Sequence, residues 1–157
     1  MRVLDIAVAV LAALVIQTVL GRYLPFFVPY IDLFAVVAAG FGLARGRMEG
    51  LLSGAVAGLV QDTFSGGLLG FNGIAKSTVG YVAGIAGRHL IIRGWSTRIL
   101  FFALATVLDL LILAVVGYAA ELPRVVGEGI APLYLCIGNA FAGILLVRTL
   151  ERRAPGD

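Results

Sequence analysis

The sequence has few charged residues: Asp, Glu, Lys and Arg make up only 13% of its 157 residues. A soluble domain typically has roughly 25%, and a chain of this length leaves much of its surface in contact with water. Hydrophobic residues make up 61%, and the mean hydropathy is +1.03. This composition excludes a soluble enzyme, a secreted disulfide scaffold and a disordered tail, and it predicts an integral membrane protein.

Residues that commonly carry out chemistry are also scarce. Cys136 is the single cysteine, in an apolar run without metal-ligand spacing, and His89 is the single histidine. There is no phosphate-binding loop, Ser-His-Asp set or zinc-ligand pattern. The sequence therefore predicts a protein without enzymatic activity, cofactor or metal. The net charge of +3 is explained by orientation in a lipid bilayer rather than by nucleic-acid binding.

Uncharged runs predict six membrane-spanning helices, because a span needs about 20 mostly apolar residues. Pro25 and Pro29 exclude a regular helix before the second span, and the Ser65-Gly66-Gly67 segment separates the third from the fourth. The expected fold is one all-α transmembrane domain over residues 1–157. Its helices are Val3–Gly21, Tyr30–Ala44, Met48–Phe64, Asn72–Gly87, one between Arg98 and Glu121, and one between Glu128 and Arg148.

The arginines predict the orientation, since cytoplasmic loops carry an excess of Lys and Arg. With both termini in the cytoplasm, nine arginines fall on cytoplasmic segments, whereas the outer segments hold only Arg22 and Arg124. The nine are Arg2, Arg45, Arg47, Arg88, Arg93, Arg98, Arg148, Arg152 and Arg153. A six-helix chain with both termini in the cytoplasm follows.

Small residues recur every three or four positions on the third and fourth expected helices. Such stripes allow two helix backbones to approach closely. One interpretation is packing of these two helices against each other, and the other is docking of a partner helix. The stripes are Gly46, Gly50, Gly54 and Gly58, and then Gly73, Ser77, Gly80 and Gly84.

Three charged residues are expected at similar depth near the outer side: Asp32, Asp62 and Lys76. A charge inside the membrane is tolerated when it is paired or faces a cavity. We expect an ion pair between Asp62 and Lys76, with Asp32 adjacent, as an internal clamp. The alternative is a small outward-facing pocket for a solute. Asp32 could instead be the N-cap of the second helix, a position that Asp favours.

Asp109 is expected near the middle of the membrane, without a charged partner at its depth. Asn139 and Gln17 are the polar side chains expected within its reach. Two hypotheses remain open: Asp109 is neutral and has no role beyond a hydrogen bond within the chain, or it contacts another subunit.

Residues 58–70, GLVQDTFSGGLLG, contain a Gly-rich helix, Asp62, a Ser-Gly break and Leu-Gly, and GYVAG follows at residues 80–84. Upstream lie PYIDL at residues 29–33 and GLARG at residues 42–46. With these motifs, residues 29–87 resemble the rod shape-determining protein MreD family, and the upstream pair is similar to the family's second helix and basic loop.

The resemblance implies a non-enzymatic component of the cell-elongation machinery in the bacterial inner membrane. Such proteins pair with the single-pass protein MreC. Together they connect MreB filaments to the peptidoglycan synthase of RodA and a class B penicillin-binding protein. We expect the MreC helix on the Gly46–Gly58 stripe or on the small face of the fourth helix. The family's fold is similar to that of the substrate-binding subunits of energy-coupling-factor transporters, and the alternative function is therefore a solute-binding subunit of a vitamin transporter.

Overall fold

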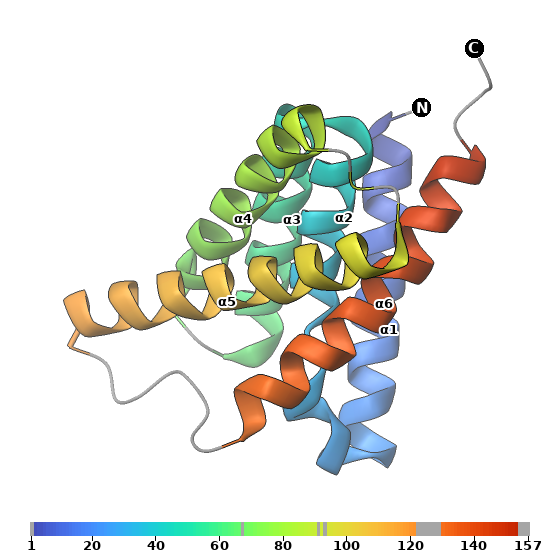
Figure 1. The fold of residues 1–157 in the computed structure, drawn as a ribbon. Helices are drawn as coiled ribbons and strands as arrows, with labels where there is room; N and C mark the ends of the chain where they lie inside the picture. Colours follow the sequence, from blue (N-terminus) through green and yellow to red (C-terminus); the bar gives the residue numbers. More distant parts are fainter. Residues whose placement is uncertain (1, 67, 91, 93, 122–129, 154–157) are drawn as a thin grey trace.

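Six α-helices and one 3-10 helix form the structure (Figure 1), a computed structural model that describes residues 2–66, 68–90, 92, 94–121 and 130–153. The described residues contain no strand, so the predicted all-α fold with six helices is confirmed. Arg93, Arg124 and Glu128 lie outside the described residues. The elements are α1 (Arg2–Tyr23), η1 (Pro25–Tyr30), α2 (Leu33–Arg45), α3 (Arg47–Ser65), α4 (Phe71–His89), α5 (Trp95–Ala119) and α6 (Ala131–Arg153).

The second helix begins later than predicted. The expected start was Tyr30, but the 3-10 helix extends to Tyr30 and α2 begins at Leu33. The Asp32 side chain accepts hydrogen bonds from the backbone N–H groups of Phe34 and Ala35. These N–H groups have no acceptor within the helix, so Asp32 is the N-cap of α2, as one of the two interpretations predicted.

Within the described part of the chain, three helices are long and apolar enough to cross a membrane: Val3–Tyr23, Trp95–Ala119 and Ala131–Arg152. The α2 helix is apolar but short. It lies in the middle of the bundle (Figure 1), and residues 34–42 are all buried. A helix that is apolar all round is suited to such a position.

The start of α1 and the end of α6 lie at the same end of the molecule (Figure 1). Ile6, near the start of α1, and Leu150, near the end of α6, belong to the same buried hydrophobic cluster. At this end Arg45 of α2 forms an ion pair with Asp5 of α1, with 2.7 Å between Nη2 and Oδ2. The α5 helix instead runs steeply across α2 and α4 (Figure 1), an orientation that determines which residues its middle can reach.

Candidate functional site

A buried lysine connects three helices. Lys76 of α4 is 0% exposed, and its Nζ lies 2.9 Å from Oδ2 of Asp32 and 3.5 Å from Oδ2 of Asp109. It also donates to Oδ1 of Asn72 at 3.0 Å. Because the two carboxylates belong to the start of α2 and the middle of α5, one ammonium group holds α2, α4 and α5 together. A buried charge is tolerated when it is paired in this way.

Asp109 therefore has a charged partner, contrary to the prediction. It is 2% exposed, and Oδ2 contacts Lys76, whereas Oδ1 is buried and has no hydrogen-bond partner. The prediction was wrong because it compared depths as if all helices ran along the membrane normal. The steep crossing of α5 brings its middle to the first turns of α4, where Lys76 lies (Figure 1).

Asp62 makes no ion pair with Lys76, so that prediction was wrong as well. Its carboxylate accepts from the N–H of Gly70 at 2.8 Å, of Asn72 at 3.0 Å and of Gly73 at 3.3 Å. The Asn72 side-chain amide adds a fourth bond at 2.8 Å. Asp62 thus satisfies free N–H groups at the start of α4, where a negative charge is also favoured by the helix dipole.

Asn72 links the two parts of this polar cluster, which we define as Asp32, Asp62, Asn72, Lys76 and Asp109. Its Nδ2 donates to Asp62 and its Oδ1 accepts from Lys76. The four charged members were all singled out from the sequence, three of them as neighbours and Asp109 apart from them, whereas Asn72 was not. Its position one helical turn before Lys76 was the available signal.

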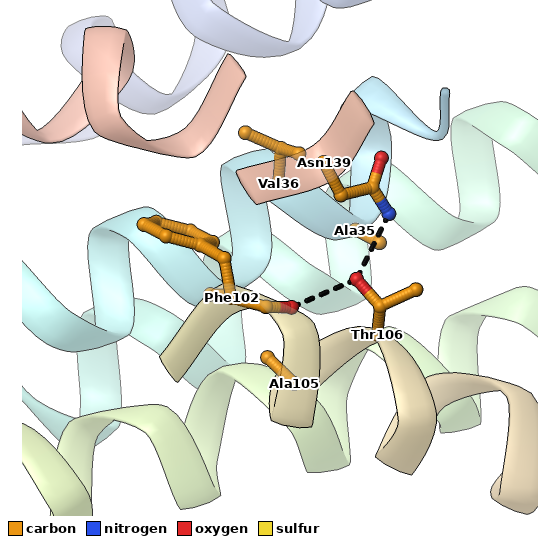
Figure 2. Close-up of a pocket in the computed structure, with 7 residues that line it drawn as sticks. Ala35, Val36, Phe102, Ala105, Thr106 and Asn139 are labelled. Atoms are coloured by element: carbon orange, nitrogen blue, oxygen red, sulfur yellow. Dashed lines mark hydrogen bonds between the residues drawn. The ribbon is translucent and has the colours of Figure 1, made fainter. Parts of the chain in front are cut away.

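Asn139 holds α6 to the same region, but not through Asp109. Its Oδ1 accepts from the backbone N–H of Asp32 at 2.8 Å, and its Nδ2 donates to Oγ1 of Thr106 at 3.1 Å (Figure 2). The predicted Gln17–Asp109 contact is also absent, because Gln17 instead donates to the carbonyl oxygen of Ile31 at 2.9 Å. These bonds attach α6 and α1 to the residues around the start of α2.

The space beside Asn139 does not provide a ligand pocket. It lies between α2, α5 and α6 and is lined by the residues in Figure 2, yet it is too small to hold a water molecule. The described residues also contain no group of three or more His, Cys, Asp or Glu side chains that could hold a metal ion. The arrangement is suited to holding helices together in an apolar environment.

The glycine stripes pack α3 against α4 of the same chain. A Cβ atom added at Gly54 would collide with the carbonyl oxygen of Lys76, and one added at Gly58 with that of Asn72. Gly50 and Gly80 face each other in the same way. The stripe on α3 is therefore filled by α4, and the alternative in which it receives a partner helix does not fit this fold.

Gly46, the first residue of the α3 stripe, and Gly84, the last residue of the α4 stripe, lie at one end of the α3–α4 pair. Gly84 lies against the backbone of Arg47. Gly46 joins α2 to α3 with a φ of +100°, in the region that favours glycine, and the guanidinium group of Arg88 lies beside it. These contacts close the end of the α3–α4 pair at which α1 begins.

The family model for rod shape-determining protein MreD matches residues 1–149. The chain belongs to the MreD family. No curated protein and no solved structure matches it. The MreD assignment indicates a role in determining rod shape, and the apolar helices fit a membrane protein. Neither finding supports the alternative of a vitamin-transporter subunit, nor the expected similarity to such subunits.

Proposed function

We propose that this MreD family member is a non-enzymatic, multi-pass subunit of the cell-elongation machinery in the bacterial inner membrane. It pairs with MreC and, directly or through MreC, with RodA and a class B penicillin-binding protein. MreB filaments are linked to it indirectly. The family match over residues 1–149 is the observation that carries this proposal.

We also propose that the chain crosses the membrane six times, with both termini in the cytoplasm. The α3 and α4 helices each have 19 residues, so each is about 28 Å long, close to the roughly 30 Å of the hydrocarbon core. Their few charges are buried in the polar cluster or lie at helix ends. The start of α1 and the end of α6 share one end of the molecule, which is consistent with an even number of spans.

We assign the MreC-binding surface to the side of α5 that faces away from the rest of the chain. Side chains at intervals of three or four residues lie on one side of a helix, and this side of α5 is strongly exposed along its length. Because lipid gives little hydrophobic drive between helices, close packing must supply the association. The face consists of Leu100, Leu104, Val107, Leu111 and Val115.

Co-purification with MreC tests this function. In cells that lack the native copy, the wild-type chain should retain MreC and restore rod shape. Leu104→Ala combined with Leu111→Ala removes packing surface from α5 without adding a charge, so MreC recovery should fall and the cells should become wider or rounded.

The matched control is Leu11→Ala combined with Val15→Ala on α1, where both side chains are equally exposed. This control should behave as the wild type. Absence of MreC beside the wild-type chain would contradict the pairing. Loss of MreC with the α1 variant alone would contradict the assignment to α5.

A further inference from the structure

We propose that the connection between α3 and α4 is inserted into the outer leaflet, at the boundary between lipid head groups and acyl chains, instead of projecting into the periplasm. We define this α3–α4 tip as residues 63–70, of which Gly67 lies outside the described residues. Acyl chains, and not another protein, then cover its apolar side chains. This placement rests on the six spans proposed above, but it does not depend on MreC.

The sequence of the α3–α4 tip has no charge. Residues 63–75 are all uncharged, and the charged residues on either side, Asp62 and Lys76, are buried. The other two connections on the outer side differ, because Arg22 is exposed at the end of α1 and Glu121 is exposed after α5. Since a charged side chain is costly in lipid, the α3–α4 tip is better suited to enter the membrane than either of these connections.

The α3–α4 tip exposes large apolar side chains. Phe64 is 68% exposed, Leu68 56% and Leu69 76%. In water, three such side chains within six residues would expose an apolar surface of the kind that marks a contact with a membrane or a partner. Among acyl chains, the same exposure carries no such cost.

Backbone groups of the α3–α4 tip are bonded within the chain. The buried carboxylate of Asp62 accepts from three N–H groups at the start of α4, and the N–H of Phe71 donates to the carbonyl oxygen of Leu68 at 3.2 Å. Lipid offers no partner to an irregular backbone, so its polar groups must be satisfied by the protein. Asp62 therefore has the role that water has in an exposed loop.

The two hydroxyl groups of the tip also donate inward. Thr63 donates to the carbonyl oxygen of Leu59 at 2.8 Å, and Ser65 donates to that of Asp62 at 3.4 Å. Both side chains are exposed, yet neither hydroxyl group needs a water molecule as its acceptor. This arrangement is suited to a surface that faces lipid.

The α3–α4 tip does not extend beyond the outer end of α1. Gln61 donates to Asp32, and Gln17 of α1 donates to the carbonyl oxygen of the preceding residue, so the two glutamines lie at a similar depth. From there α3 continues four residues to Ser65, about 6 Å, whereas α1 continues six residues to Tyr23, about 9 Å.

Figure 1 shows the same relation, since α1 and the 3-10 helix reach further at this end than the turn between α3 and α4. The α1 segment Val3–Tyr23 is apolar enough to cross a membrane. A tip at the depth of its last turns therefore lies in lipid, and it anchors the α3–α4 pair in the outer leaflet.

Fluorescence quenching of a label at Leu69 tests this placement. In a chain with Cys136→Ser, Leu69→Cys is labelled with bimane and reconstituted into phosphatidylcholine vesicles at a large excess of lipid. Phosphatidylcholine with a nitroxide near the head-group end of its acyl chain should remove most of the fluorescence, whereas iodide in the aqueous phase should remove little. Leu68→Cys should respond in the same way.

Glu121→Cys and Leu11→Cys in the same background are the controls. Glu121 is exposed on the same outer side, so its label should be quenched by iodide. Leu11 is exposed in the middle of α1, so its label should be protected from iodide and quenched by a nitroxide deeper in the acyl chain. Circular dichroism must show the same helix content for every variant.

Strong iodide quenching at Leu68 and Leu69 would overturn the proposal and place the tip in water. Weak quenching by both reagents would also overturn it, because protein would then cover these side chains. Iodide quenching at Leu11 together with lipid quenching at Glu121 would instead contradict the membrane placement on which the proposal rests.

Discussion

Lys76 has no exposed surface and lies between two carboxylates, so its removal leaves more than one group without a partner. Breaking a buried ion pair by removing one partner typically costs about 3–5 kcal/mol, because the other charge remains buried. We therefore expect Lys76→Met and Asp32→Asn each to lower the stability in detergent by about this amount. The double variant should recover part of the loss, as measured by thermal unfolding of the purified chain.

Asp62 is the control for this double-mutant cycle of Asp32 and Lys76. It accepts four hydrogen bonds from the start of α4 and has no direct contact with Lys76. Asp62→Asn combined with Lys76→Met should therefore show much weaker coupling than Asp32→Asn with Lys76→Met. Stronger coupling for Asp62 would indicate that Lys76 is paired differently from the arrangement described here.

The residues of the polar cluster could be found from the sequence, but their partners could not. A charge in an apolar run is conspicuous, so Asp32, Asp62, Lys76 and Asp109 were all identified. Pairing depends on which face of each helix a residue occupies and on how the helices cross. Asp109 reaches Lys76 only because α5 crosses the bundle steeply (Figure 1), and hydropathy carries no information about such an angle.

At the scale of the elements, the α3–α4 pair is defined by close backbone contact. Gly54→Ala would place a Cβ atom on the backbone of Lys76, and forcing extra atoms into a packed interface typically costs about 1–3 kcal/mol. We expect this variant to unfold at a lower temperature than the wild type in detergent.

Gly73→Ala is the matched control on the facing helix. An added Cβ there would lie 3.5 Å from the Leu59 side chain, an ordinary contact. Since Ala is favoured over Gly in a helix by roughly 1 kcal/mol, its stability should be unchanged or slightly higher. Equal destabilisation by both variants would contradict the description of this interface.

Helix positions were predicted well because each boundary has a local chemical cause. Ser65 and Gly66 end α3, and Gly46 separates α2 from α3. The start of α2 was misplaced because Tyr30 continues the apolar pattern, although it belongs to the 3-10 helix. The α2 helix starts where Asp32 caps it. From the sequence, this N-cap was only one of two interpretations of Asp32.

At the scale of the whole molecule, the topology can be tested directly. A reporter fused after Asp157 should be active only in the form that requires the cytoplasm, and a reporter before Met1 should give the same result. The physical basis is the uneven distribution of arginine between the two sides. Periplasmic activity at the C-terminus alone would exclude an even number of spans.

The order of the ion-pair partners along the chain has a consequence for synthesis. Asp32, Lys76 and Asp109 leave the ribosome in that order. When α4 is inserted, the Asp32 carboxylate that pairs with Lys76 has therefore already been synthesised. Asp109 later enters beside an ammonium group that is already held in the bundle. In the proposed six-span arrangement, α4 and α5 therefore do not keep a bare charge in lipid, whereas Asp62 of α3 gains its hydrogen-bond partners only when the start of α4 follows it.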